Sequence, residues 1–140
     1  MLRKVIVIED DPWSQDFYKI FFKKLCDEVF ILEDFDSIIT EIENGDVDLI
    51  IMDINIKNTY WNSERLDGIK LSSIIKRRFH YLKIPILLIS AYSFSGSGSN
   101  ALADSLADDY FIKPICDYNK LVNKINKLVY SKDERQNINS

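Results

Sequence analysis

Polar side chains that can carry chemistry stand directly after short apolar runs at four places in this sequence. In chain order they are Glu9 and Asp10, Asp53, Ser90 and Lys113. Phosphoryl transfer needs such a set, because its transition state spreads negative charge over oxygens that a cation, a hydroxyl donor and a lysine can stabilise. Asp53 is the candidate reactive residue, since as a nucleophile it would form an acyl phosphate.

The three carboxylates in this set predict a bound cation. Acids held close together repel one another, and each is driven toward its protonated form unless positive charge is present. Mg²⁺ fits because it prefers oxygen ligands and commonly takes one or two carboxylates, several waters and a phosphate. We therefore expect Glu9 and Asp10 to hold Mg²⁺ against one phosphoryl oxygen, while Ser90 and Lys113 each reach another.

The apolar runs predict how these residues are brought together. The run from Leu49 to Met52 has no polar alternation, which is typical of a strand covered on both faces of a parallel sheet. Shorter or similar runs, each separated from the next by a helical segment or loop, span residues 5–8, 29–32, 86–89 and 110–112. This order predicts an α/β fold with helices on both sides of one parallel sheet. Such folds place their chemistry at the edge where the strands end.

Helical spacing of apolar residues predicts the segments between the runs. The first helix is expected to begin with Asp11 as its cap and Pro12 at its first position. Its predicted apolar face consists of Trp13, Phe17, Ile20, Phe21 and Leu25. Further helices are predicted over residues 37–43, 69–79 and 101–107 and along the segment 121–129.

Three segments lack a regular period. Residues 57–65 are predicted as a long loop that ends at Asp67-Gly68, and residues 94–100 are flexible by composition. Residues 131–140 are predicted as a polar, frayed tail. With 140 residues, 46% of them hydrophobic and 29% charged, the sequence predicts one globular domain over residues 1–130 before that tail.

Composition argues against several classes of protein. The net charge of -4 disfavours direct nucleic-acid binding, which relies on clustered Lys and Arg. Cys26, Cys116 and His80 form no metal-ligand spacing, and both cysteines are interpreted as free and reduced, as in a cytosolic protein. The first eleven residues contain too few apolar residues for a signal peptide or membrane span. We expect a soluble, cytoplasmic protein without membrane contact.

Four motifs, in this order and at these spacings, resemble those of one family: VIVIEDD, LIIMDIN, LLISAYS and DDYFIKP. From about Val5 to Val129 the chain resembles the receiver domain of bacterial two-component response regulators, of the chemotaxis-regulator type. The resemblance implies a flavodoxin-like, doubly wound sheet of five parallel strands in the order 2-1-3-4-5, with five helices. It also implies a signalling switch rather than an enzyme, one that catalyses only its own Mg-dependent phosphorylation and dephosphorylation.

Carried over residue by residue, the resemblance assigns roles within the site. Asp53 matches the phosphoacceptor, and it would also be a ligand of Mg²⁺. Asp10 would bind Mg²⁺ directly, Glu9 mostly through water, and Asn55 through its backbone carbonyl. The other matches are Ser90, which moves toward the phosphoryl group, Lys113, the family's lysine before proline, and Tyr110, the aromatic that swings inward on activation.

The chain departs from the family pattern in two places. The family usually reaches its Asp-Gly pair through a short loop that contains proline, whereas residues 56–66 form a longer segment without proline that carries Tyr60 and Trp61. An altered partner contact or phosphate lifetime is expected there. The second departure is SGSGS at residues 95–99, beside the surface that the family uses for output. Tyr92 lies where the family tunes dephosphorylation.

The favoured hypothesis is a phosphorylated receiver. A sensor histidine kinase or a histidine phosphotransfer protein would phosphorylate Asp53, and the face built from the fourth helix, fifth strand and fifth helix would change its affinity for a partner. That partner would be a downstream protein, a missing output domain or a second copy of the chain in a phosphorylation-dependent homodimer. The chain would be a stand-alone receiver or a piece of a longer protein.

Other interpretations stay open at this point. A receiver-like interaction module that is never phosphorylated is the main alternative. A hydrolase of the haloacid-dehalogenase type needs a second Asp two positions after its nucleophile, where this chain has Asn55. The simpler structural interpretations are a capping role for Asp53 or Asp11, a solvated acid at Glu9, a core tyrosine at Tyr110, and surface loop residues at Tyr60, Trp61 and Tyr92.

Overall fold

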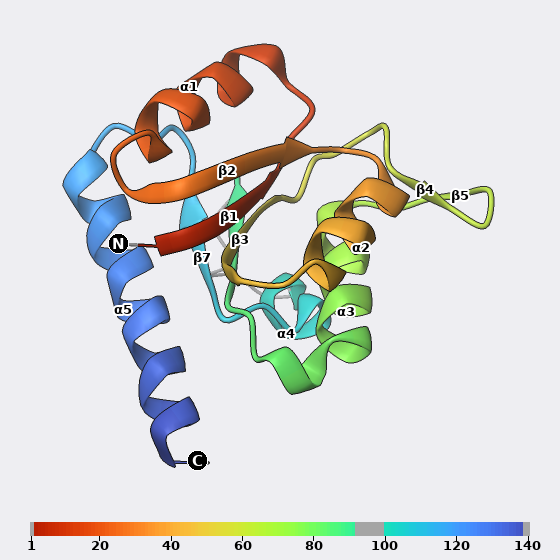
Figure 1. The fold of residues 1–140 in the computed structure, drawn as a ribbon. Helices are drawn as coiled ribbons and strands as arrows, with labels where there is room; N and C mark the ends of the chain where they lie inside the picture. Colours follow the sequence, from red (N-terminus) through yellow and green to blue (C-terminus); the bar gives the residue numbers. More distant parts are fainter. Residues whose placement is uncertain (1, 92–99, 139–140) are drawn as a thin grey trace.

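The sheet has the predicted topology. The structure is a computed structural model that describes residues 2–91 and 100–138. Within these ranges one sheet contains five parallel strands in the order β2-β1-β3-β6-β7, which confirms the predicted 2-1-3-4-5 order (Figure 1). Its strands are β1 (Leu2–Ile8), β2 (Cys26–Leu32), β3 (Val47–Asp53), β6 (Ile86–Ser90) and β7 (Asp109–Ile112).

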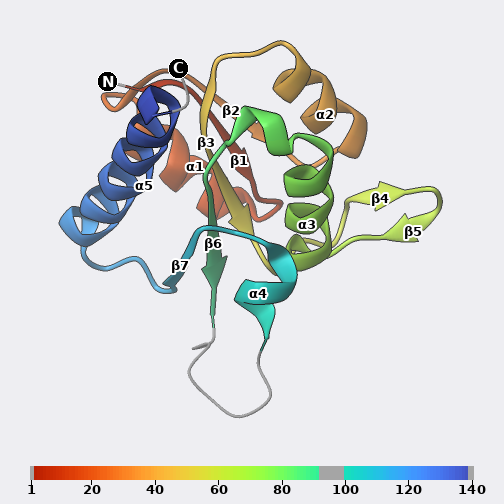
Figure 2. The ribbon, with the colours of Figure 1, turned by 90° about the horizontal axis from the view of Figure 1, so that it is seen from below.

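Helices cover both faces of the sheet (Figures 1 and 2). One face carries α1 (Pro12–Phe22) and α5 (Tyr118–Ile138), and the other carries α2 (Phe35–Glu43), α3 (Gly68–Arg78) and α4 (Ala101–Ser105). Successive side chains of a strand point to opposite faces. On β3, Ile50 and Met52 therefore join the core under α2 and α3, while Leu49 and Ile51 join the core under α1 and α5.

Burial on both faces explains why β3 shows no polar alternation. Its residues Leu49 to Met52 are at most 1% exposed. Each such side chain contributes about 1.5–3 kcal/mol on burial, so a polar residue at any of these positions would be costly. The register then fixes the strand ends: Ile8 pairs with Met52, Asp53 with Ile89, and Ser90 with Ile112. The residues that follow these strands meet at one edge of the sheet.

The predicted apolar face of α1 was wrong in part. The helix buries Tyr18 and Phe22 against the sheet, whereas Trp13 is 85% and Ile20 is 76% exposed. The aromatic residues of this helix cover about half of its circumference, which is wider than one buried stripe, so helical spacing alone allows two different apolar faces. The predicted cap is confirmed: the Asp11 carboxylate accepts a hydrogen bond from the Ser14 N–H at 2.9 Å.

The segment predicted as a loop contains a small hairpin. Strands β4 (Tyr60–Trp61) and β5 (Glu64–Arg65) pair antiparallel and project from the domain beside α2 (Figures 1 and 2). The turn between them places two residues at positive φ, Asn62 at 53° and Ser63 at 66°. Such a turn matches the twist of paired strands, which is why hairpins favour it.

Several element boundaries differ from the predicted ones. Helix α2 begins at Phe35 after the capping residue Asp34, and β2 begins at Cys26 rather than Val29. Helix α4 ends at Ser105, and a short 3-10 helix, η1 (His80–Leu82), follows α3. Helix α5 continues to Ile138 through most of the segment predicted as a frayed tail. Tyr92 and the SGSGS segment lie outside the described residues.

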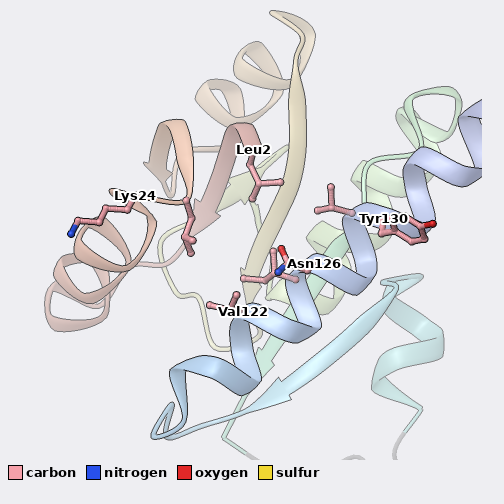
Figure 3. Close-up of a pocket in the computed structure, with 8 residues that line it drawn as sticks. Leu2, Lys24, Val122, Asn126 and Tyr130 are labelled. Carbon is pink, nitrogen blue, oxygen red and sulfur yellow. The ribbon is translucent and has the colours of Figure 1, made fainter.

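A groove at the opposite end of the sheet offers little chemistry (Figure 3). Its volume is about 490 Å³, and Leu2 of β1, Lys24 after α1, and Val122 and Asn126 of α5 contribute to its walls. Lys24 is the one charged residue among the described residues that line it. The acids of the predicted site lie at the other end, at the carboxyl edge of the sheet.

Among the described residues no helix is long and apolar enough to cross a membrane.

Gly68 lies where the start of α3 touches the backbone after β3. A Cβ added to Gly68 would lie 2.1 Å from the Asp53 carbonyl oxygen and 2.7 Å from the Ile54 Cα, so the two segments would have to separate. We expect Gly68→Ala to lower the free energy of unfolding by about 1–3 kcal/mol, the usual effect of overpacking. Urea denaturation would measure this loss.

Gly45→Ala is the matched control for this substitution. Gly45 has a φ of 92° and no atom within 4 Å of an added Cβ, so the substitution brings backbone strain without a collision. That strain should cost about 1 kcal/mol. A loss at Gly68 no larger than the loss at Gly45 would contradict the close approach of the two backbones.

Candidate functional site

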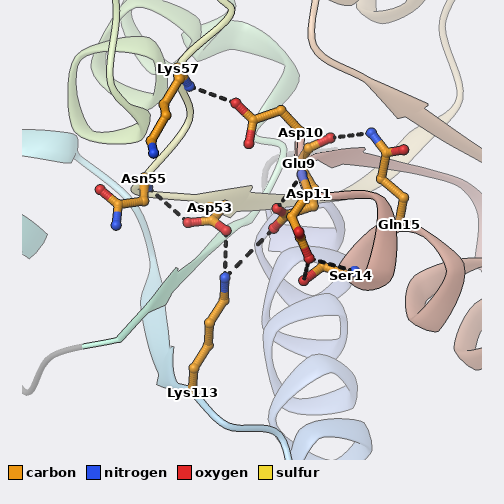
Figure 4. Close-up of polar contacts among 9 residues, drawn as sticks. All are labelled: Glu9, Asp10, Asp11, Ser14, Gln15, Asp53, Asn55, Lys57 and Lys113. Carbon is orange, nitrogen blue, oxygen red and sulfur yellow. Dashed lines mark hydrogen bonds and ion pairs between the residues drawn. The ribbon is translucent and has the colours of Figure 1, made fainter.

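Asp53 is buried at the carboxyl end of β3 and both of its oxygens are held. The Asn55 N–H donates to Oδ1 at 2.8 Å, and the Lys113 ammonium group lies 2.6 Å from Oδ2 (Figure 4). Burial by itself would raise the pKa of Asp53. The neighbouring Glu9 carboxyl, the hydrogen bonds from Lys113 and the Asn55 N–H, and the charge of Lys113 outweigh burial and lower that pKa below its usual range. Asp53 is therefore an ionised carboxylate.

Glu9 is 1% exposed and only half satisfied. Its Oε1 accepts a hydrogen bond from the Asp11 N–H at 3.0 Å. Its Oε2 is buried without a hydrogen-bond partner and lies 3.8 Å from the Lys113 Nζ. Burial, with the added effect of the neighbouring Asp53 carboxylate, raises the pKa of Glu9 to about 8. A buried acid with a free oxygen indicates a place where positive charge is missing.

Asp10 lies on the open side of the pocket. It is partly exposed, and its Oδ2 accepts a hydrogen bond from the backbone N–H of Lys57 at 2.6 Å. Lys57 follows β3 by four positions and lines the same pocket as the acids, as does Asn55. This pocket, about 410 Å³ in volume, contains Glu9, Asp10, Asp53 and Lys113 among its walls.

Lys113 connects β7 to the acids on β1 and β3. Burial alone would lower the pKa of its ammonium group, but the hydrogen bond to Asp53 and the charges of Asp53, Glu9 and Asp11 raise it. Lys113 is therefore a permanent cation here. Its backbone N–H also donates to the Ser90 carbonyl at 2.7 Å, so the ends of β6 and β7 are joined.

The two predicted switch residues lie on neighbouring strands. Ser90 is buried at the end of β6, and Tyr110 is half-buried in β7 and packs against the core under α3. Lys124 of α5 holds the tyrosine segment: its ammonium group donates to the Tyr110 carbonyl at 2.9 Å and lies 5.3 Å from the centre of the Tyr110 ring. The same ammonium group forms an ion pair with Asp109 at 3.4 Å.

An apolar recess adjoins the acidic pocket. It has a volume of about 510 Å³, and Lys113 and Ser14 belong to the walls of both. Its other walls come from Trp13, Phe17, Tyr18, Ala91, Pro114 and Ile115. The surface around the acids thus combines a charged centre with an apolar margin on the side of α1.

The structure brings five of the predicted site residues together around the acidic pocket: Glu9, Asp10, Asp53, Asn55 and Lys113. Ser90 ends the neighbouring strand β6, whereas Tyr110 lies within β7 beside Leu88 and not at this edge.

Two contacts in the site were missed from the sequence. Gln15 donates from its side-chain amide to the Glu9 carbonyl at 2.7 Å, and the Lys57 N–H contacts Asp10. Gln15 lies one helical turn after the Asp11 cap, a spacing that offered a weak signal. No sequence signal marks Lys57, because its contribution comes from the backbone.

The fold and the site have counterparts among known proteins. The model of the response regulator receiver domain family matches residues 5–126. No curated protein sequence matches the chain. NtrX from Brucella abortus in complex with ADP has a similar structure, with a TM-score of 0.80 and 20% sequence identity. That similarity covers 99% of this chain and 30% of NtrX, so the chain spans about a third of that protein.

Isolated receiver structures agree over nearly their full length. A CheY-like receiver domain from Methanospirillum hungatei gives a TM-score of 0.76 at 20% identity, covering 96% of this chain and 99% of the other. The N-terminal receiver domain of a response regulator from Bacteroides fragilis gives 0.72 at 21%, covering 92% and 98%. At these identities the structures support the fold, while the family match covers most of the sequence. The chain belongs to the response regulator receiver domain family of two-component signalling systems.

Proposed function

We propose that the chain accepts a phosphoryl group on Asp53 and acts as a phosphorylation-dependent switch in the cytoplasm. The donor would be the phosphohistidine of a sensor histidine kinase or of a histidine phosphotransfer protein. The observation that supports this best is the arrangement of Asp53: an ionised carboxylate at the sheet edge, held by Lys113 and the Asn55 N–H, with Glu9 and Asp10 beside it. Phosphoryl transfer relies on such prearranged charge.

The reaction assigns one task to each group of the chain. An oxygen of Asp53 forms a bond to phosphorus while the bond from phosphorus to the histidine nitrogen breaks, and the nitrogen keeps the bonding electrons. Lys113 offsets the charge of the acceptor beforehand and can stay with the oxygens of the transferred group. Ser90, buried at the end of the next strand, would donate its hydroxyl to a phosphoryl oxygen once that group is in place.

The residues present fit a Mg²⁺ ion. Asp10 and Asp53 would bind it directly, Asn55 through its backbone carbonyl and Glu9 through water. Among the described residues no three His, Cys, Asp or Glu side chains already close around one point. Mg²⁺ needs fewer, because waters and a phosphate oxygen usually complete its octahedron, and the unpartnered Glu9 Oε2 fits one of those waters. When bound, the ion supplies positive charge to the phosphoryl oxygens.

Exposed apolar surface beside the acids favours a protein as the donor. Trp13 of α1 is 85% exposed, and with Phe17 and Ile115 it lines the recess that shares Lys113 with the site. Large exposed apolar side chains that lie together mark protein contacts more often than isolated ones do. A phosphohistidine carried by a protein could dock on this margin while it reaches Asp53.

Signal output would depend on Ser90 and Tyr110. Movement of Ser90 toward the phosphoryl group would let Tyr110 turn inward, and the surface of α4, β7 and α5 would change. Only a partner with different affinities for the two states can transmit the signal. Such a partner would be a downstream protein, an output domain, or a second copy of the chain. Hydrolysis of the acyl phosphate by the chain itself would reset the switch.

Incubation with acetyl phosphate tests the proposal directly. We expect the intact mass of the protein to rise by one phosphoryl group in the presence of Mg²⁺, and to stay unchanged with a chelator or in Asp53→Asn. The control variant is Asp11→Asn, which alters an exposed neighbouring acid that caps α1 and should still be labelled. An unlabelled protein, under conditions that label a known receiver, would favour the unphosphorylated interaction module.

The pKa of Glu9 predicts how stability depends on pH without divalent cations. Because that pKa rises from 4.5 to about 8 on folding, the folded state holds more protons than the unfolded state between these values. The stability associated with this protonation is present below pH 4.5 and is lost as pH rises through about 8. Glu9→Gln should flatten this decline, by up to about 1.4 kcal/mol per pH unit. The lowered pKa of Asp53 affects the pH dependence of stability only at more acidic pH, below the usual pKa of a carboxyl group.

Urea denaturation in a chelating buffer at several pH values measures this effect. Equal pH slopes for the wild type and Glu9→Gln would show that Glu9 titrates normally in the folded protein. Asp16→Asn provides the comparison for an exposed acid, since its side chain is 72% exposed. That variant should leave the slope unchanged.

A further inference from the structure

The backbone N–H group that holds Asp10 comes from much farther along the chain than those that hold Glu9 and Asp53. Neighbouring backbone groups hold Glu9 and Asp53: each accepts from the N–H of the residue two positions later, at 3.0 and 2.8 Å. Asp10 instead accepts from the N–H of Lys57, which is 47 positions away. At 2.6 Å this contact has the short length of a hydrogen bond to a charged acceptor. The other oxygen of Asp10 receives no hydrogen bond from the described residues.

The position of Lys57 is fixed by contacts on both sides. Ile56 is buried in the core under α2 and α3. Thr59 is 0% exposed, and its hydroxyl donates to the Glu33 carbonyl at 2.6 Å. The side chain of Lys57 is exposed between these two anchors, while its N–H points toward Asp10 (Figure 4). The buried residues on both sides of Lys57 therefore hold its backbone N–H toward Asp10.

The same anchors hold the root of the β4–β5 hairpin. The Leu66 N–H donates to the Thr59 carbonyl at 2.9 Å, and the ring of Trp61 stacks on Phe35 of α2 with centroids 5.4 Å apart. The hairpin is thus held against the β2–α2 connection by the Thr59–Glu33 hydrogen bond and the Trp61–Phe35 stacking. Lys57 lies in the chain between Asp53 and these contacts. The longer segment without proline, which sets this chain apart from the family pattern, supplies a backbone donor to the metal site.

We propose that Lys57 is a positioning residue for the metal: its backbone N–H holds one oxygen of Asp10, so that the other faces the ion. The inference rests on the Mg²⁺ site of the proposed function and deepens it. Groups that orient a metal ligand typically affect metal affinity 10- to 100-fold. Because the donor is the backbone, the effect depends on the N–H and not on the lysine side chain.

Two substitutions of the same residue separate these contributions. Lys57→Pro removes the N–H and should weaken Mg²⁺ binding by about 10- to 100-fold. Lys57→Ala keeps the N–H and removes the exposed ammonium group, and should change the affinity by less than about fivefold. Mg²⁺ titrations followed by amide NMR give the dissociation constants, and thermal unfolding without metal shows whether each variant is folded. Equal affinities for Lys57→Pro and Lys57→Ala, with both folded, would overturn the proposal.

Hydrogen exchange in the wild type tests the contact even if Lys57→Pro does not fold. The Lys57 amide should exchange slowly with and without Mg²⁺, and quickly in Asp10→Asn, whose neutral side chain is a weaker acceptor. Unprotected exchange in the wild type would refute the positioning role. The failures of the two proposals differ: no Mg²⁺ binding by the wild type counts against the metal site itself, whereas normal binding by Lys57→Pro counts only against Lys57.

Discussion

Burying two carboxylates beside each other requires positive charge within hydrogen-bonding distance, and the ion pair between Lys113 and Asp53 supplies it. The distance of 2.6 Å joins groups that are 60 positions apart in the chain. Burial and the neighbouring Asp53 raise the pKa of Glu9, although the same ammonium group lies 3.8 Å from its Oε2. Lys113 therefore balances the negative charge of Asp53, whereas a negative charge on Glu9 would have no cation within hydrogen-bonding distance among the described residues. A divalent cation would complete the balance, and a phosphoryl group would then meet a site already arranged for its charge.

The parallel sheet is what makes this unfavourable arrangement possible. Residues of β1, β3 and β6 that are almost fully buried on both faces fix the three strands in register, and their ends then have no freedom to separate. The free energy of apolar burial greatly exceeds the repulsion between two acids, so the fold can tolerate the site. Gly68 adds a local requirement, because the start of α3 passes so close to the Asp53 carbonyl that no side chain fits between them.

The parts of this structure that follow from local pattern were predictable from the sequence, and those that depend on distant contacts were not. The fully buried run before Asp53 indicated a central parallel strand, and the order of runs and helices indicated the doubly wound sheet. The inner face of α1 was predicted wrongly, because Trp13 and Ile20 have the same apolar character as the buried Tyr18 and Phe22. The β4–β5 hairpin escaped prediction because each strand has two residues, and its support comes from Phe35 and Glu33 elsewhere in the chain. A backbone donor such as the Lys57 N–H leaves no trace in residue type.

Lys124 gives α5 a direct energetic connection to the orientation of one ring. Its ammonium group binds the carbonyl of Tyr110 and faces the ring of the same residue, so it contacts a part of Tyr110 that stays in place and a part that can rotate. Rotation of the ring away from Lys124 would forfeit about 0.5–1 kcal/mol of cation–π attraction, a roughly two- to fivefold bias in rotamer population. The carbonyl contact would remain. If the Tyr110 ring has a second position, the charge of one partly buried lysine of α5 would help to set how often the ring occupies it.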